Sequence, residues 1–540
     1  MGATTASAGS AGTGPSAWAP LRSGSFRALW LAGLVGLTGV WFQTVGAQWL
    51  LVSHPHASIL VSLVQVATTL PYVLFGLVAG VLADTLDRRL ILITVQAGVA
   101  ALGAVLAALT FAHLMPPALL LLLVFLLGTG AALGTPSYQS LVPELVPRDE
   151  IPAASALNSI SINVARALGP AIAGVLVATA GVGTTFTVAA VTALCYAVVV
   201  ALWRPTTTER PRPERFVPAF RAGSRYVRNA PVVRRILLRA ALFLVPASSL
   251  FALLPLIASN RLRLGSGGYG LLLAALGLGA IAGALVLPRV RTRLSINTLV
   301  TLASGSYALV LAAVALLHDA VPVLLLLIPA GVAWVVVLST LNASLQLFLP
   351  AWVRGRSLAV YTIVLFGSQA LGALIFGTLA DLLGLVQALL IAAGSAAVAA
   401  ASIRIWPFLE TSGMNRSTVV YWPEPQLASD LDLDGRTITV TVSYRVPTAN
   451  QRPFVEAMAR VRGSRLRTGA VSWALYRDGE HDDTFVELFV VPSWEEHLRQ
   501  HHERLTGTDR AYQQRAAALS EGEPVVAHLV DVDVPPRAET

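Results

Sequence analysis

The sequence predicts an all-α polytopic membrane protein, with twelve transmembrane helices in two six-helix parallel repeats, followed by a C-terminal α+β ferredoxin-like domain. Three observations support this prediction. Hydrophobic residues make up 55% of the 540-residue chain and charged residues only 12%, whereas roughly a quarter of the residues of a soluble protein are charged. Many apolar segments are long enough to cross a bilayer. After Trp406 the composition changes sharply to that of a soluble domain.

Twelve apolar segments of spanning length follow one another along the chain. They cover residues 26–52, 59–83, 90–112, 118–142, 154–180, 184–203, 236–259, 269–287, 296–317, 321–347, 358–383 and 385–406. The first six form an N-terminal half over 21–203 and the last six a C-terminal half over 236–407. Residues 1–20 are rich in Gly, Ala, Ser and Thr and have no basic n-region, so we expect a disordered cytoplasmic tail instead of a cleaved signal.

The distribution of arginine predicts the orientation in the membrane. The chain has 38 arginines, no lysine and a net charge of +9. With the N-terminus inside, the inner loops up to Arg356 hold 20 arginines and the outer loops hold only Arg261 and Arg263. Positively charged loops remain in the cytoplasm. We therefore expect a multi-pass protein of the cell membrane with both termini in the cytoplasm. This placement explains the charge better than nucleic-acid binding does. The single cysteine, Cys195, excludes an intrachain disulfide framework.

The two halves repeat one another at a constant offset. A shift of 203 residues pairs small or rigid residues of one half with those of the other: Gly76 with Gly279, Gly80 with Gly283, Gly128 with Gly331, Pro147 with Pro350, Gly169 with Gly372, Gly174 with Gly377 and Gly181 with Gly384. Two six-helix halves in the same orientation are typical of transporters, whose substrate pathway lies between the halves near the bilayer midplane.

The loop that joins the halves, residues 204–235, is rich in Pro and Arg in its first part, which we expect to be irregular. Its second part, together with the start of the next helix (220–239), predicts a basic amphipathic helix. Such a helix suits the anionic inner leaflet, and regulation by a partner is the alternative.

Residues 408–434 form a polar linker, and residues 435–534 predict a cytoplasmic domain of the order β-α-β-β-α-β, which is ferredoxin-like. Its strands are expected at 437–446, 471–477, 484–491 and 525–532, and its helices at 452–467 and 494–505, the latter extended by 511–519. Both helices would cover one face of the sheet. The other face would then be free to pair with a second copy, so a homodimer is a candidate assembly.

Two motifs in the N-terminal half carry a family resemblance. The segment Gly80-Val-Leu-Ala-Asp84-Thr-Leu-Asp-Arg88-Arg89 resembles the signature loop between helices two and three of the major facilitator superfamily, although Thr85 and Asp87 depart from it. The fifth segment contains Gly169-Pro170 and Gly174, which resembles the motif of the exporter branch. The stretch 143–158 is similar to the drug-efflux subfamily that contains enterobactin exporters, and the tail resembles antibiotic-biosynthesis monooxygenase domains. Transporters with such a tail are called transmembrane secretion effectors.

The resemblance implies the function of the chain. It implies a secondary active exporter of small, largely hydrophobic molecules such as drugs, antibiotics or siderophores, which works by alternating access and is proton-coupled. No ATP-binding motif and no cofactor motif is present in the sequence. The alternative is a membrane-tethered enzyme whose monooxygenase-like tail modifies a metabolite. An importer is a third alternative, and the Gly-Pro motif argues against it.

The same resemblance assigns gating roles to several residues. Asp84 would form a charge latch between the halves with Arg88 as partner, and Arg89 would be a plain membrane anchor. Pro170 removes a backbone donor in mid-membrane, while Gly169 and Gly174 allow close approach of another helix. The kink and the tight contact would restrict leakage and favour export.

Arg166 is the one charge near the middle of a predicted helix, and no acid lies at comparable depth. Such a residue should face a cavity or a partner. Three roles are open: a tie to carbonyl groups or a helix end, a part of the proton-linked switch, or contact with an anionic substrate. The other candidates for the cavity wall are polar side chains, at Gln43, Gln48, Gln65, Gln139, Asn158, Asn163, Asn342, Gln346 and Gln369, and aromatic ones, at Trp41, Phe42, Trp49, Trp334 and Phe366.

Histidines in the tail invite a metal interpretation. His497 and His501 are one helical turn apart, which suits zinc, and His502 follows. The pattern lacks the glutamate of the metalloprotease motif and a defined third ligand. We therefore expect no metal site here, but a solvated or interface helix.

Overall fold

The computed structural model describes residues 16, 18–204, 216–409, 414–415, 417, 419 and 436–531. Most of the expected N-terminal tail, the first part of the loop between the halves and most of the expected linker lie outside these residues. The chain forms two compact units. The first contains Met1–Pro213, Ala240–Thr340 and Thr362–Ile405, and the second contains Glu214–Arg239, Leu341–Tyr361 and Trp406–Thr540.

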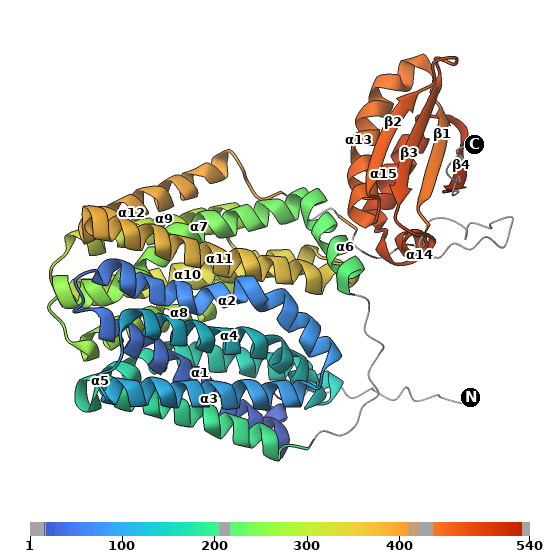
Figure 1. The fold of residues 1–540 in the computed structure, drawn as a ribbon. Coiled ribbons are helices and arrows are strands. Elements are labelled where there is room, and N and C mark those ends of the chain that lie inside the picture. Colours follow the sequence, from blue (N-terminus) through green and yellow to red (C-terminus); the bar gives the residue numbers. More distant parts are fainter. Residues whose placement is uncertain are drawn as a thin grey trace, which may run out of the picture. The chain divides into compact units, whose positions relative to one another are not determined.

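Eleven helices in the described residues are long and apolar enough to cross a membrane (Figure 1). They are α1 (Gly24–Leu51), α2 (Ala57–Thr85), α3 (Arg88–Phe111), α4 (Pro117–Leu141), α5 (Ile151–Leu202), α7 (Pro231–Leu256), α8 (Ser266–Arg291), α9 (Ile296–Leu316), α10 (Ala320–Phe348), α11 (Ala351–Leu383) and α12 (Leu385–Ala401). Shorter helical turns flank them at Ala19–Arg22, Val142–Glu144, Arg148–Glu150, Ile257–Arg261 and Ser402–Arg404.

Helix α5 contains two of the twelve predicted spans. Its 52 residues would extend about 78 Å, far more than the roughly 30 Å of a bilayer core. Gly181 interrupts it with φ 82° and ψ 168°, between the predicted spans 154–180 and 184–203. The prediction of twelve membrane crossings is therefore confirmed, with the fifth and sixth joined at a single glycine.

The break recurs in the other half, at the residue that the 203-residue repeat pairs with Gly181. Gly384, the counterpart of Gly181, separates α11 from α12 and has φ 96°. Only glycine takes up such positive φ values without strain. Equivalent helix pairs also pack through equivalent glycines. A Cβ atom on Gly128 of α4 would lie 3.0 Å from the Ala67 carbonyl oxygen of α2, and one on Gly331 of α10 would overlap the Leu276 carbonyl oxygen of α8.

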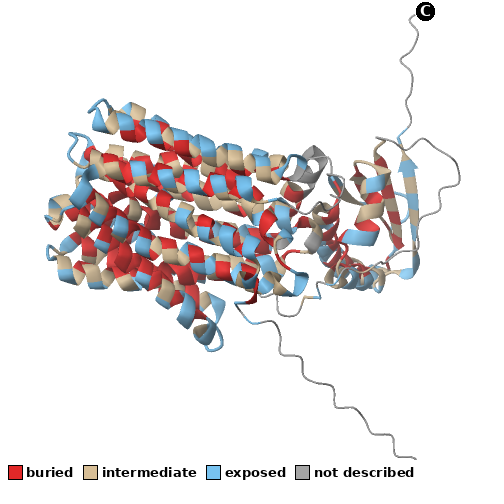
Figure 2. Ribbon diagram, turned by 90° about the horizontal axis from the view of Figure 1, so that it is seen from below, coloured by how far each residue is buried: buried red, intermediate tan, exposed pale blue. Residues whose placement is uncertain are grey.

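The outer faces of the helices in the first unit are apolar. In Figure 2 the buried residues gather between the helices, whereas exposed and intermediate residues face outward. Leu285, Leu309 and Leu382 are 66%, 73% and 73% exposed. In water such leucines would be unfavourable, but hydrocarbon solvates them as well as a protein core does. The exposed leucines therefore mark the lipid-facing surface.

The amphipathic helix predicted over 220–239 is two helices, α6 (Phe216–Asn229) and the start of α7. Pro231 explains the break. It disfavours helical geometry at Ala230, and it lacks the N–H group that would continue the hydrogen-bond ladder. Proline is accepted at the first position of a helix, where no such bond is needed.

The tail forms the predicted ferredoxin-like domain. Its elements are β1 (Ile438–Arg445), α13 (Gln451–Thr468), β2 (Ser472–Arg477), β3 (Thr484–Val491), α14 (Trp494–Arg499), a π-helical turn (Gln500–Arg504), α15 (Gly507–Ala517) and β4 (Glu521–Val530). The sheet is antiparallel with the order β2-β3-β1-β4. The helix predicted over 494–505 is present as α14 and the π-helical turn, and a break separates it from α15, which covers most of the extension predicted over 511–519. A capping box between Thr506 and Asp509 starts α15.

A hydrophobic core fills the space between this sheet and its helices. Val440, Val442 and Phe489 on the sheet belong to one buried cluster with Phe454 and Met458 on α13. Because side chains alternate across a strand, every second residue of β1 and β3 is buried here.

Candidate functional site

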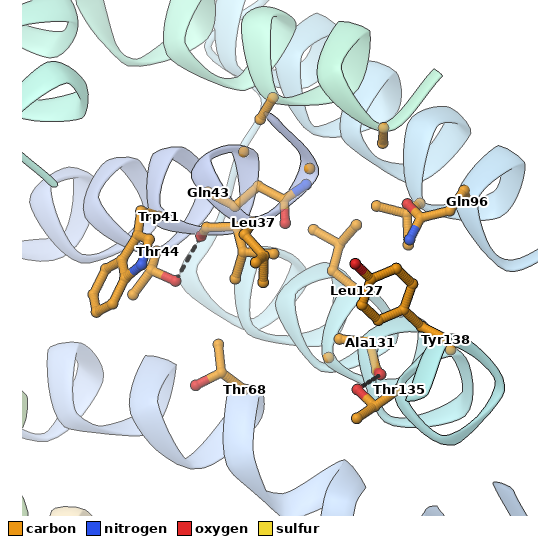
Figure 3. Close-up of a pocket in the computed structure, with 18 of the residues that line it drawn as sticks. Leu37, Trp41, Gln43, Thr44, Thr68, Gln96, Leu127, Ala131, Thr135 and Tyr138 are labelled. Carbon is orange, nitrogen blue, oxygen red and sulfur yellow. Dashed lines mark hydrogen bonds between the residues drawn. The ribbon is translucent and has the colours of Figure 1, made fainter. Parts of the chain in front are cut away.

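A cavity of about 430 Å³ lies inside the first unit. Helices α1 to α5 form most of its wall, and Phe366 and Gln369 of α11 complete it. Five of the polar side chains expected to face a cavity do so: Gln43, Gln65, Gln139, Asn158 and Gln369. Figure 3 shows part of this wall, with Trp41, Gln43 and Thr44 on one side and Tyr138 and Thr135 on another.

Threonines on the wall are already engaged with their own helices. The Thr44 hydroxyl donates to the Val40 carbonyl at 2.9 Å, and the Thr135 hydroxyl to that of Ala131 at 2.7 Å (dashed lines in Figure 3). Their protons are therefore not available to a bound molecule. The amide side chains, which have donors and acceptors on one short group, are the adaptable polar contacts of this cavity.

Aromatic residues complete the wall, and sequence reasoning missed most of them. Tyr72 stacks on Phe366 with ring centroids 4.2 Å apart, and Tyr138 meets Tyr196 edge to face at 6.4 Å. These rings link α2 with α11 and α4 with α5. Gln96 of α3 was also missed. A tyrosine in an apolar segment is equally suited to the membrane interface. The sequence alone therefore does not distinguish a tyrosine on the cavity wall from one at the interface.

A second, smaller cavity of about 190 Å³ adjoins the first. Both share Trp41, Thr44, Gln65 and Gln369, and the second adds Arg166. Arg166 makes no hydrogen bond or ion pair that the described residues show, and the lining of neither cavity contains an acid. The other residues around it are Gln48, Phe251, Tyr269, Leu273 and Trp334.

The halves meet tightly at the helix ends remote from the N-terminus. Cβ atoms built on Gly174 of α5 and Gly270 of α8 would lie 2.8 Å and 2.9 Å from the other glycine's Cα atom. On the opposite flank, a Cβ on Gly377 of α11 would overlap the Ser62 Cβ of α2. These close approaches exclude any larger side chain, so the predicted role of Gly174 as a contact glycine has a geometric basis.

Polar contacts reinforce this seam. The Tyr269 hydroxyl donates to the Gln48 carboxamide oxygen at 2.5 Å, and His56 Nδ1 lies 3.4 Å from a carboxylate oxygen of Asp381. The larger cavity lies toward the other end of the bundle, because Gln139 and Asn158 on its wall belong to the last turns of α4 and the first turns of α5. The bundle is thus closed on one side, and its cavity extends toward the side of the Gly80–Arg89 loop.

Three side chains of the Gly80–Arg89 segment make local polar contacts. Asp87 caps α3 by accepting from the backbone N–H groups of Arg89 and Leu90. Arg88 forms an ion pair with Glu144, and Arg89 donates to the Val200 carbonyl at 3.2 Å. These bonds all remain within the N-terminal half. The side chain of Asp84, predicted to form the latch, lies outside the described residues.

Three predicted polar residues, Asn163, Asn342 and Gln346, and two predicted aromatic ones, Phe42 and Trp49, are not among the lining residues of either cavity. Asn163 donates to the Ser159 carbonyl one turn earlier, at 2.9 Å. Gln346 donates to Asn342 on the same face of α10, at 3.1 Å. These three amides thus make hydrogen bonds within their own helices.

The tail histidines are arranged differently from the expected solvated or interface helix. His497 and His501 are buried, and Nε2 of His497 lies 3.2 Å from Nε2 of His501 and 3.0 Å from Nε2 of His528 on β4. Burial, with the nearby His528 and Arg465 adding to it, lowers the pKa of both His497 and His501 to about 3. Strand β4 brings in the third histidine from a distant part of the sequence. Among the described residues no group of three histidine, cysteine or acidic side chains is arranged to hold a metal ion.

Comparison with known proteins gives consistent matches. A family profile described as "Transmembrane secretion effector" matches residues 15–535. The chain is 26% identical to a staphyloferrin A transporter of Staphylococcus aureus, over 65% of this chain and 88% of that protein. It is 30% identical to an enterobactin exporter of Shigella boydii, over 48% of this chain and 62% of the exporter. The match therefore spans less than two thirds of the exporter.

Solved structures with the same fold are transporters. A bacterial homologue of the human lysosomal transporter Spinster, inward-facing and occupied, has a TM-score of 0.58 at 15% identity and matches 72% of this chain and 97% of that one. The nucleoside transporter NupG has a TM-score of 0.53 at 15% identity, over 72% of this chain and 100% of that one. At these identities the likeness shows the fold alone.

Proposed function

Because this chain belongs to the transmembrane secretion effector family of the major facilitator superfamily, we propose that it is a secondary active exporter of small, largely hydrophobic molecules. It is a multi-pass membrane transporter. Its relatives include a staphyloferrin A transporter and an enterobactin exporter, so siderophore-like molecules are the first substrate class to test. Drugs and antibiotics are the wider class.

One observation supports the export mechanism: a cavity extends toward one end of the bundle, and glycine contacts between the halves close the other end. Alternating access requires such an asymmetry, with one seam closed while the other allows entry. We take the closed seam to be the extracellular one, because the arginine-rich loops lie at the other end. In this orientation the cavity receives cargo from the cytoplasm.

Gating would involve the residues that the family motifs single out. Gly174 lets the closed seam form, and Gly169-Pro170 shapes the same helix beside Trp41. On the cytoplasmic side, no atom lies within 4 Å of a Cβ built on Gly76 or Gly80. These glycines would allow close approach when that side shuts, with Asp84 as the charged latch and Arg88 tying the neighbouring loop to Glu144.

The tail is proposed to be a docking module for the transporter, not an enzyme. Within the second unit, Arg504 bonds to Glu496 at 2.8 Å and covers the ring of Trp352 near the start of α11, at 4.8 Å. Arg225 of α6 lies 3.9 Å from Glu496, and Tyr226 meets Trp352 edge to face at 5.7 Å. The soluble domain thereby contacts the first turn of α11, which continues as a membrane span. Through this contact the tail could influence gating.

Dimerisation through the tail is a further part of this proposal. The sheet face away from the helices presents Leu488 and Val490 of β3 on one side of β1 and Val525 and Leu529 of β4 on the other side. Val525 and Leu529 are 69% and 53% exposed. A second copy of the sheet would cover them. Sedimentation of residues 430–540 would give a dimer, and turnover of an aromatic metabolite by this fragment would favour the enzyme alternative.

The test of export is transport into inverted membrane vesicles that contain the protein. Vesicles are energised with a proton gradient and supplied with a panel of siderophores and amphiphilic drugs. We expect accumulation of some panel members, and its loss when an ionophore collapses the gradient. Accumulation unchanged by the ionophore would contradict proton coupling, and none for any compound, with the protein folded in the membrane, would contradict export.

A further inference from the structure

We propose that Arg166 is the recognition point for an anionic group of the cargo, so that the protein takes amphiphilic carboxylates, or comparable oxyanions, with an apolar or aromatic body. This inference deepens the proposed function and, for its transport consequence, rests on it. The binding claim stands on the cavity alone.

The position of Arg166 makes its charge costly. Arg166 is halfway between Ile151, where α5 begins, and Gly181, where the helix breaks. A charged side chain at this depth requires a partner or a polar cavity. Because the guanidinium keeps its proton at all relevant pH values, it cannot become neutral to avoid this cost.

The described residues provide no compensating partner. Arg166 has no hydrogen bond or ion pair to any of them, and no aspartate or glutamate is among the residues that line the two cavities. A guanidinium has five N–H donors in a planar fork that fits a carboxylate with two parallel bonds. The missing partner is therefore best supplied by the molecule that enters the cavity.

Two of the three roles considered for Arg166 lose support from this geometry. A structural tie would show bonds to carbonyl oxygens or to a helix end, and the described residues show none. A proton-linked switch would need a titrating acid beside the guanidinium, because arginine itself does not titrate. Contact with an anion is the role that the surroundings of Arg166 favour.

The rest of the wall suits the body of such a molecule. Trp41, Phe251 and Trp334 surround Arg166 with aromatic surface, and the Phe251 and Trp334 rings lie 4.7 Å apart. Gln65 and Gln369 belong to both cavities and can bond to polar substituents. The cavities together thus offer one cation, amides and apolar rings, which is the pattern of an amphiphilic anion site.

Binding of a matched pair of probes tests the proposal directly. The purified full-length protein is placed in phosphatidylcholine nanodiscs, and quenching of tryptophan fluorescence is measured with 1-naphthoate and with its neutral analogue 1-naphthamide. We expect wild type to bind naphthoate at least ~10-fold more tightly, because only the carboxylate can form a charge-assisted pair with the guanidinium. Arg166→Gln should lose this preference, whereas Arg166→Lys should keep part of it.

Gln369→Leu is the matched control, because it alters the same cavity without altering charge. It should affect both probes alike. Equal affinities of wild type for the two probes, or an unchanged preference in a folded Arg166→Gln protein, would overturn the inference. If phosphatidylglycerol nanodiscs abolish naphthoate binding to wild type, the oxyanion that Arg166 holds is a lipid headgroup, and the cargo assignment fails.

The anion-site proposal and the export proposal can fail independently of each other. A charge preference that depends on Arg166, in a protein that accumulates nothing in inverted vesicles, would support the anion site and reject export. Export of anionic and neutral compounds at equal rates by wild type and Arg166→Gln would support export and reject the anion site.

Discussion

Helices α5 and α11 occupy equivalent places in the two halves and differ in what they add to a shared frame. Gly169 and Gly174 of α5 correspond to Gly372 and Gly377 of α11 at the 203-residue offset. Each of these glycines lies so close to another helix that a Cβ atom would come within 3 Å of it. The repeated residues thus maintain packing between helices.

The residues that are not repeated differ in chemistry. Arg166 of α5 corresponds to Gln369 of α11, and both line the smaller cavity. Pro170 corresponds to Ala373. Because proline has no N–H group, the Arg166 carbonyl lacks its usual helical donor. The scaffold is therefore symmetric, whereas the charge and the proline beside the cavity belong to one half only.

The largest expected effect comes from the shared frame. Gly174→Val should abolish export, since even its Cβ atom would lie 2.6 Å from the Ser266 carbonyl oxygen. Gly377→Val should do the same if the frame is symmetric. Transport in inverted vesicles measures both. Gly98→Val is the control, because nothing lies within 4 Å of its Cβ position; normal export by either seam variant would break the symmetry argument.

Moving the positive charge from position 166 to its counterpart at position 369 tests whether the two helices are interchangeable. Arg166→Gln should reduce export of an anionic substrate by about 10-fold or more, in line with the loss of one charge-assisted pair. The double variant Arg166→Gln/Gln369→Arg should recover part of the rate, because the cation returns to the same cavity from the other helix. Initial rates of vesicle uptake measure this. A double variant as poor as the single one would mean that the cation must come from α5.

The tail has no counterpart in the repeat, so its variants should affect its own stability. His497 and His501 have a pKa near 3 in the folded domain and about 6.5 when unfolded. Between these values the unfolded state binds more protons, so stability falls as the pH drops below about 6.5. Two such groups lose roughly 2–4 kcal/mol between pH 6.5 and 5.

Thermal unfolding of the isolated tail measures this loss. The midpoint at pH 5 should be about 10 °C or more below that at pH 7. His502→Gln should leave most of the difference, because this side chain is exposed and is the weakest of the groups that lower the pKa of His501. His497→Phe should reduce it. Equal midpoints for wild type at the two pH values would show that the histidines become protonated without cost in the folded domain.

The smallest effect is expected from the helix irregularity. Pro170→Ala should restore the hydrogen bond to the Arg166 carbonyl and lower the export rate a few-fold, since the helix becomes straighter beside the cavity. Ala373→Pro makes the reverse change in α11, where it removes the donor to the Gln369 carbonyl. The measurement is the rate of vesicle uptake by each variant, normalised to the amount of protein in the membrane and compared with wild type. Pro170→Ala at the wild-type rate would assign the proline a purely structural part.

The sequence was sufficient for the crossings and the repeat because both depend on residue type along the chain. Apolar length defines a span, and Gly181 and Gly384 mark breaks that only glycine accepts easily. The cavity wall was harder to predict. In a membrane bundle the lipid-facing and core-facing sides of a helix are both apolar, so the usual periodicity that locates the buried face is weak. Amides such as Gln43 and Gln139 were identifiable because they are costly in lipid, whereas Tyr72 and Tyr196 were not.

Long-range pairing accounts for the remaining differences. The burial of His497 depends on β4, which places His528 against it across 31 residues of chain. Helix spacing alone indicated only that His497 and His501 share a face. Similarly, the partner of Arg88 is Glu144, in another loop of the same half, and the family signature contains no information on that pairing.

We propose that the protein works by alternating access around a seam between the halves. Locking that seam tests this mechanism most directly. His56 and Asp381, whose side chains meet at 3.4 Å, are replaced by cysteines in a Cys195→Ser background and joined with a short reducible crosslinker. We expect crosslinked protein in inverted vesicles to stop exporting and to recover when the crosslink is reduced. Full export by completely crosslinked protein would contradict it.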